Sequence, residues 1–128
     1  EISADDLSMM TLIFNKNIIV HLHLDYFSRP EFKSCKIKGI DGTIYWDSIL
    51  NEVKIYSKNK KEWKIIFKLE KFDRNAMFID ELKYFLKCVK NKKNTFNSIN
   101  DAKKTLQVVL DAKKSSSQGK IINKNKLS

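Results

Sequence analysis

Two histidines and an aspartate alternate with leucines along one hydrophobic stretch, in the order His21, Leu22, His23, Leu24, Asp25. In an extended strand, alternate side chains lie on one face, about 7 Å apart per step. Imidazole and carboxylate groups on one face could hold zinc or iron. The alternative is a polar column that faces water, a partner or a substrate. Because the chain has no other histidine, we favour the polar column and predict no metal site.

A stretch with two glycines, Gly39–Asp47 with the sequence GIDGTIYWD, raises the question of a phosphate-binding loop. A dinucleotide-binding loop needs GxGxxG at the start of a helix. Here apolar residues continue to alternate after the second glycine, so no helix follows. Asp41 and Gly42 predict a type I′ hairpin turn, since both residue types tolerate a positive φ. No serine or cysteine has a recognisable nucleophile motif around it and no pair of carboxylates stands out, so we predict no catalytic residue.

These residues lie in a chain whose hydrophobic period changes near residue 72, from two, which predicts strands, to 3.6, which predicts helices. The predicted strands are Ser8–Asn15, Ile18–Phe27, Phe32–Ile40, Thr43–Asp47, Glu52–Lys58 and Glu62–Glu70, with a first turn at residues 15–17. The predicted helices are Asn75–Val89 and Asn100–Ser115. Ser98 and Asp101 resemble a capping box at the start of the second helix. The predicted fold class is therefore α+β: a six-stranded, largely antiparallel sheet with two C-terminal helices packed on one face.

The alternation also predicts which side chains are buried. Trp46 alternates with Ile44, and Trp63 alternates with Ile65 and Phe67, so both tryptophans are predicted core residues. The first two strands are apolar on both sides. One of these sides carries Met9, Thr11, Ile13 and Ile19. Because two helices can cover only one face, we expect a second copy of the chain, or another segment, to bury part of the other face.

Composition limits the class of protein. The 128 residues are 42% hydrophobic, which suits one domain, and no apolar run reaches the roughly 18 residues of a membrane span. The net charge of +10 comes almost wholly from lysine, because Arg29 and Arg74 are the only arginines. Nucleic-acid recognition usually depends on arginine, so we favour a lysine-coated surface. Cys35 and Cys88 lack CxxC spacing, as expected of reduced, cytoplasmic thiols.

Five motifs in order resemble one family. They are LDYFSRP at Leu24–Pro30, IKGIDGTIYWD at Ile37–Asp47, RNAMFIDELKYF at Arg74–Phe85, Asn100–Ala102 followed by Leu106–Leu110, and Ser115–Ile122. Together they resemble the C-terminal domain of the glucose–fructose oxidoreductase / inositol dehydrogenase (Gfo/Idh/MocA) family, over Ser8 to Ile122. The Asp-Tyr…Arg-Pro variant is similar to members that act on nucleotide-linked or surface-polysaccharide sugars.

The resemblance implies that residues 1–122 form the C-terminal α+β domain of an NAD(P)-dependent oxidoreductase, and residues 123–128 a loose polar tail. Family members carry an N-terminal Rossmann domain that binds NAD(P) and a catalytic lysine in a Glu-Lys-Pro motif. This sequence contains neither motif. We therefore expect it to be cut from a longer protein, with no catalytic and no cofactor-binding residue of its own.

In this family the C-terminal sheet forms one wall of the sugar pocket and, by its open face, the contact between subunits. The resemblance therefore implies three partners: the chain's own Rossmann domain, a sugar-type substrate and a second copy. We expect Asp25, Tyr26 and Arg29 to lie toward the substrate, since a guanidinium can clamp a carboxylate or phosphate and a tyrosine offers a hydroxyl and a stacking face. The alternative is that Tyr26 is a core residue and Arg29 a surface residue at a strand end.

Two other functions stay open. A lysine-rich sheet could bind single-stranded nucleic acid, as sheet platforms do. That function needs aromatic residues beside the lysines, and Tyr56 is the only clear one in the sequence, so nucleic acid is the less favoured partner. The other function is that of a free-standing interaction domain.

Overall fold

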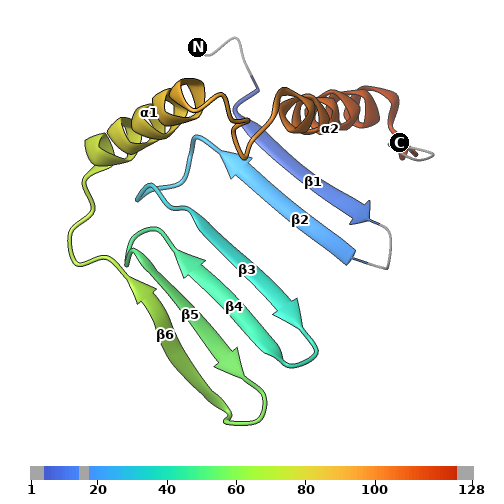
Figure 1. Cartoon of the computed structure of the whole chain (residues 1–128). Coiled ribbons are helices and arrows are strands. Elements are labelled where there is room, and N and C mark those ends of the chain that lie inside the picture. Colours follow the sequence, from blue (N-terminus) through green and yellow to red (C-terminus); the bar gives the residue numbers. More distant parts are fainter. Residues whose placement is uncertain (1–4, 15–17, 124–128) are drawn as a thin grey trace. The chain divides into compact units, whose positions relative to one another are not determined.

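The structure, a computed structural model, describes residues 5–14 and 18–123, in two compact units, residues 1–74 and 75–128. The described part of the first unit contains strands β1 to β6, and that of the second contains helices α1 and α2 (Figure 1). Strands precede helices, so the predicted α+β class is confirmed. The loop predicted at residues 15–17 and the last five residues of the predicted tail lie outside the described residues.

The first two strands form an antiparallel hairpin. β1 (Leu7–Phe14) pairs with β2 (Ile18–Asp25). Residues that lie directly opposite each other in such a pair share a face. We call one side of the hairpin the histidine face; it carries Met9, Thr11, Ile13, Ile19, His21 and His23. The other side carries Met10, Leu12, Val20 and Leu22, so both sides bear apolar side chains, as predicted.

The next four strands form an antiparallel sheet in sequence order. They are β3 (Ser34–Gly39), β4 (Gly42–Asp47), β5 (Glu52–Ser57) and β6 (Glu62–Lys68). The prediction of one six-stranded sheet is wrong, since the strands form two separate sheets of two and four strands. Alternation specifies which side chains share a face, but it does not specify which strand lies beside which. Here the chain turns out of β2 at Asp25, and β3 pairs only with β4 among the described strands.

The turn between β3 and β4 differs from the predicted one. Its two residues are Ile40 and Asp41, between the paired Gly39 and Gly42. Neither Asp41 nor Gly42 has a positive φ, so the type I′ prediction is wrong. Glycine is needed at position 42 for another reason, because a Cβ there would overlap the backbone carbonyl oxygen of Tyr56 in β5. The glycine allows two backbones to approach closely.

An irregularity in the last strand pair changes the faces of the sheet. Val53 in β5 lies opposite Phe67 in β6, but the next residue, Lys54, lies opposite Ile65. This β-bulge leaves Ile66 as the extra residue and reverses the alternation of side chains along β6. Trp63 and Ile65 therefore lie on the face opposite to Phe67, whereas the sequence pattern predicts all three on one face.

The second unit contains α1 (Arg74–Lys90) and α2 (Ile99–Gln118). The capping box is confirmed: the Ser98 hydroxyl accepts the backbone N–H of Asp101, whose carboxylate accepts the backbone N–H of Ser98. Gly119 ends α2 with a left-handed φ of 61°, the usual role of glycine after a helix. The predicted packing of both helices on one sheet face involves both units, and it stays a prediction.

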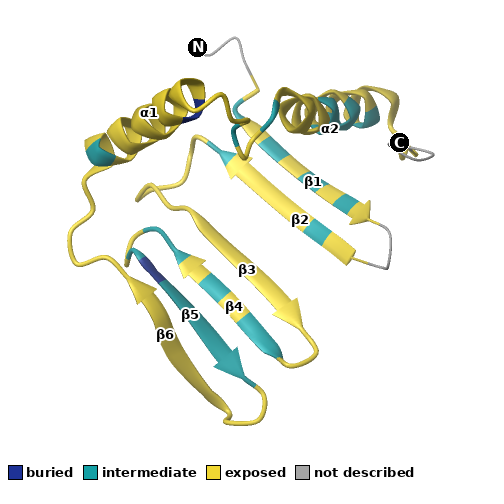
Figure 2. Cartoon of the chain, in the orientation of Figure 1, coloured by how far each residue is buried: buried dark blue, intermediate teal, exposed yellow. Residues whose placement is uncertain are grey.

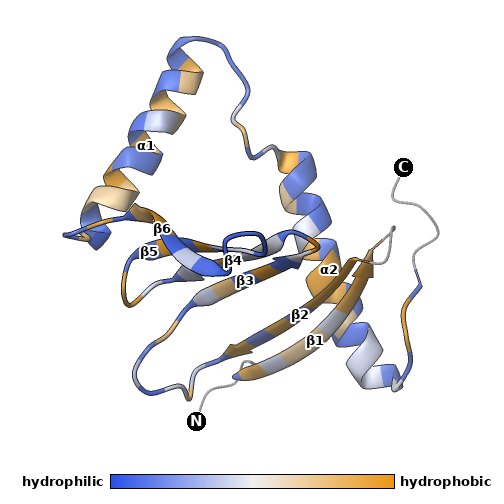
Figure 3. Cartoon of the chain, turned by 90° about the horizontal axis from the view of Figure 1, so that it is seen from below, coloured by the Kyte–Doolittle hydropathy of each residue, from blue (hydrophilic) through white to orange (hydrophobic). Residues whose placement is uncertain are grey.

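Few side chains are buried. Among the described residues only Cys88 and Glu52 count as buried, and both cysteines are free thiols. Trp46 and Trp63, predicted as core, are 39% and 48% exposed. Exposure extends along most of β2, β3 and β6 (Figure 2), and β1 and β2 are largely hydrophobic (Figure 3). In the part of the chain that the structure describes, no helix is long and apolar enough to cross a membrane.

Candidate functional site

The turn that follows β2 is held together by Asp25. Its Oδ1 accepts the backbone N–H groups of Phe27 and Ser28 at 2.7 and 2.6 Å, and its Oδ2 accepts the Ser28 hydroxyl at 2.9 Å. His23 Nε2 lies 2.8 Å from the same Oδ2. The hydrogen bonds from Ser28, with those from Phe27 and His23, lower the pKa of Asp25 to about 2, because they favour the ionised form. Both carboxylate oxygens of Asp25 thus accept hydrogen bonds from the turn or from His23. Asp25 therefore stabilises the turn, and little of its hydrogen-bonding capacity is left for a ligand.

Tyr26 and Arg29 lie in the same turn. Arg29 Nη1 donates to the carbonyl oxygens of Tyr26 and Ser28, each at 2.9 Å, and the bond to Pro30 is cis. Tyr26 is 67% exposed, so the alternative that it is a core residue does not hold. The structure thus brings the three predicted residues into one turn. Contact of any of the three with a substrate stays a prediction.

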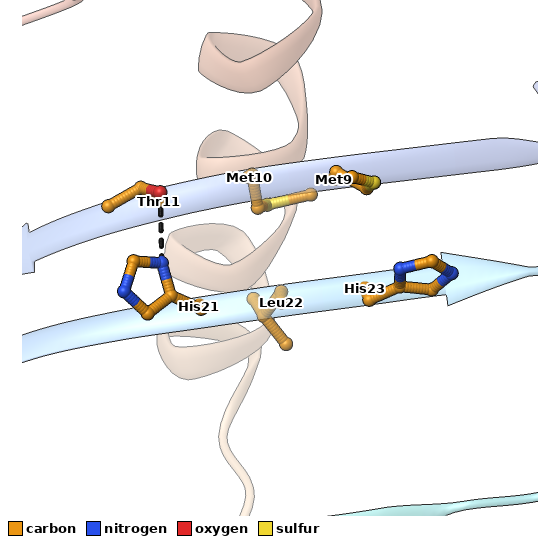
Figure 4. Close-up of a pocket in the computed structure, with 6 residues that line it drawn as sticks. All are labelled: Met9, Met10, Thr11, His21, Leu22 and His23. Carbon is orange, nitrogen blue, oxygen red and sulfur yellow. Dashed lines mark hydrogen bonds between the residues drawn. The ribbon is translucent and has the colours of Figure 1, made fainter.

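The β1–β2 hairpin carries a shallow hollow that is lined by residues of both of its sides. It has a volume of about 310 Å³ and is lined by residues of both strands: Met9, Met10, Thr11, His21, Leu22 and His23 (Figure 4). His21 Nδ1 lies 3.1 Å from the Thr11 hydroxyl, whereas His23 pairs with Asp25. The two imidazoles therefore bond to different neighbours. No group of three or more metal-ligating side chains occurs in the described ranges, and we assign no metal to this hollow.

A second set of polar and aromatic side chains lies on the four-stranded sheet. We call the side that bears Lys36, Tyr45, Lys54, Tyr56 and Trp63 the lysine–aromatic face. The strand register places these residues together: Lys36, Tyr45 and Lys54 form one row across β3, β4 and β5, and Tyr56 lies opposite Trp63. The opposite side of the sheet carries Ile37, Ile44, Trp46, Val53 and Phe67.

Cations and rings alternate on the lysine–aromatic face. The Nζ atoms of Lys36 and Lys54 each lie 5.3 Å from the centroid of the Tyr45 ring, and Lys54 Nζ lies 5.5 Å from the Trp63 ring. These distances are within cation–π range. Tyr56 and Trp63 form a tilted pair with centroids 5.5 Å apart. Lys36, Tyr45, Lys54 and Trp63 line a groove of about 230 Å³.

The turn after β4 orients one of these rings. Asp47 accepts the backbone N–H groups of Ile49 and Leu50 at 2.8 and 3.0 Å, and the Tyr45 hydroxyl donates to its other oxygen at 3.3 Å. The Leu50 amide, followed by the Ile49 amide, the Tyr45 hydroxyl and the charge of Lys54, lowers the pKa of Asp47. The ionised Asp47 carboxylate thus holds both the turn after β4 and the hydroxyl of Tyr45.

The sequence predicted a lysine-rich sheet face with Tyr56 on it, but not the two rings of Tyr45 and Trp63. The alternation of Tyr45 with Trp46 was a readable signal that Tyr45 points to the lysine side. Trp63 carried no such signal, because only the bulge after Val53 moves it to that side. A regular pattern of Trp63, Ile65 and Phe67 cannot show where a strand pair slips by one residue.

Comparisons with protein families, with curated proteins and with solved structures find no match for this chain. The residues present also do not fit a dinucleotide cofactor. The only stretch with closely spaced glycines forms the β3–β4 hairpin, and no helix N-terminus follows it to receive a phosphate.

Proposed function

We propose that this chain is the substrate-wall and oligomerisation domain of an NAD(P)-dependent oxidoreductase that acts in the cytoplasm on a sugar or a sugar nucleotide. The observation that carries the proposal is the exposure of apolar side chains on both the β1–β2 hairpin and the four-stranded sheet. Ile13 and Ile19 on the histidine face are 73% and 58% exposed, and Ile44 on the four-stranded sheet is 39% exposed. Contiguous exposed apolar surface marks an interaction site. The proposal is that these apolar side chains are buried by the Rossmann domain, the two helices and a second copy of the chain.

The turn from Asp25 to Pro30 supplies the proposed substrate contacts. Asp25 holds the backbone, the guanidinium of Arg29 donates to the backbone carbonyl oxygen of Tyr26, and Tyr26 itself is exposed. A guanidinium can bind phosphate or carboxylate through two parallel hydrogen bonds. Arg29 would therefore bind the anionic group of a sugar nucleotide or sugar acid, and Tyr26 would stack on the sugar or donate its hydroxyl.

The first test is the gene sequence upstream of the Glu1 codon. A strand–turn–helix with GxGxxG and a Glu-Lys-Pro motif are expected there, and an in-frame start at that codon would overturn the proposal. In the longer protein, Arg29→Gln should raise KM for a sugar nucleotide and leave KM for NAD(P)H unchanged. Arg74→Gln, which changes the only other arginine, is the matched control. Equal effects of the two variants would show that charge loss alone is responsible and would remove Arg29 from the site.

A further inference from the structure

The lysine–aromatic face is not explained by the proposed substrate turn, and its charge is unbalanced. The register places four lysines on this side, Lys36, Lys38, Lys54 and Lys68, against two carboxylates, Asp47 and Glu52. Asp47 is occupied by its own turn. Glu52 is buried and lies 3.7 Å from Lys54. The face therefore presents a net positive charge beside the half-buried rings of Tyr45 and Tyr56 and the exposed ring of Trp63.

A second copy of the chain does not suit this face. Two such faces brought together would place lysines opposite lysines, and like charges across an interface are unfavourable. An acidic partner satisfies the charges. An acidic peptide of aspartate and glutamate, however, offers no flat aromatic ring to stack on those of Tyr45, Tyr56 and Trp63. The occupant that matches both features carries regularly spaced negative charges and flat aromatic groups.

Single-stranded nucleic acid has this chemistry. Lysines neutralise phosphates, and the flat rings of bases stack on aromatic side chains with little regard to sequence. Four-stranded antiparallel sheets with exposed aromatic residues are known to stack two or three bases in this way. The β3–β6 sheet has the same strand number, and its rings lie on three adjacent strands: Tyr45 and Tyr56 on the inner strands β4 and β5, and Trp63 on the edge strand β6.

We propose that the lysine–aromatic face binds single-stranded nucleic acid, with a base stacked on Trp63 in the groove and phosphates held by Lys36 and Lys54. The proposal is independent of the proposed oxidoreductase function, because it uses none of the residues of the Asp25–Pro30 turn. Binding is weakly selective for sequence, since the contacts are ring faces and point charges.

Fluorescence anisotropy of the full chain with labelled oligo(dT) and oligo(U) of about ten nucleotides tests the proposal. Saturable binding in the micromolar range is expected at about 50 mM salt, and the contacts of the two lysines should weaken it by about sevenfold at 200 mM. In a Trp46→Phe background, Trp63 is the only tryptophan, so quenching of its fluorescence reports stacking directly.

Variants separate this face from general attraction to a basic protein. Trp63→Leu should weaken binding about tenfold or more, whereas Trp63→Phe keeps a ring and should retain most of it. Lys54→Gln should reduce the salt slope by about 0.7. Lys64→Gln is the matched control, because Lys64 neighbours Trp63 in β6 but lies opposite Ile55 on the other side of the sheet. It removes the same charge and should leave the affinity nearly unchanged.

Four outcomes would overturn the proposal. The first is no retention of either oligonucleotide at about 50 mM salt. The second is equal weakening by Lys64→Gln and Lys54→Gln, which would indicate non-specific attraction. The third is equal competition by a polyglutamate peptide, which would make the site one for acidic protein. The fourth is binding of uridine monophosphate as tight as that of oligo(U), which would make the site one for mononucleotides.

Discussion

The double substitution of Ile13→Lys and Ile19→Lys tests whether the histidine face joins two copies of the chain. The two residues lie opposite each other at the end of the hairpin away from Asp25. Ile13 is 73% exposed, Ile19 is 58% exposed, and Met9 on the same face is 68% exposed. A twofold axis through this face would bring the same side chains of two copies together.

The magnitude follows from those exposed fractions. Full burial of an isoleucine side chain contributes about 1.5–3 kcal/mol, so the exposed share of the two isoleucines corresponds to about 2–4 kcal/mol per copy. Two copies give about 4–8 kcal/mol, and the loss of even the lower value raises the dissociation constant about a thousandfold. The introduced lysines add like-charge repulsion, so the variant should be a monomer at every concentration that light scattering can reach.

Light scattering and sedimentation of the unmutated chain and the variant at about 100 µM provide the assay. Ile40→Lys is the matched control, because Ile40 is 87% exposed in the β3–β4 turn and lies on the other sheet. Circular dichroism checks that each variant keeps its strands and helices. A monomeric mass for the unmutated chain would refute the reasoning, as would dissociation by Ile40→Lys to the same extent.

Three further predictions concern local structure. The pKa of Asp25 is about 2, below the ordinary 3.8; the stability from its hydrogen bonds is therefore present above pH 3.8 and lost as pH falls toward 2. Its carboxyl carbon should titrate near pH 2 by NMR, and a midpoint near 4 would contradict the hydrogen-bond network. Gly42→Ala should destabilise the chain in urea by about 1–3 kcal/mol, whereas Gly39→Ala should cost less, because a Cβ there would lie 3.9 Å from its nearest neighbour. Ser98→Ala should lose about 1 kcal/mol of helix stability in thermal unfolding followed by circular dichroism, and Ser117→Ala, near the other end of α2, should not.

The residues of the candidate turn were predicted, but the hydrogen bonds that hold the turn together were not. The residues Asp25, Tyr26 and Arg29 were named from a motif, and the structure places them in one turn. The motif could not show that the carboxylate is directed to backbone N–H groups. Such bonds depend on the path of the chain after the strand, and an Asp-Tyr-Phe-Ser stretch is compatible with several paths.

The sequence by itself determined the kinds of element and their order. Period-two and period-3.6 patterns each arise from local backbone geometry, so the sequence predicts strands within residues 8–70 and helices within residues 75–115, with the capping box of Ser98 and Asp101. The tertiary structure alone decided which strands pair and which face each ring occupies. A separate hairpin and a bulge between Val53 and Lys54 depend on hydrogen bonds between distant segments, which no local pattern encodes. For that reason Trp63 lies beside Lys54 and Tyr56 on the lysine–aromatic face, where alternation alone would have placed it with Phe67.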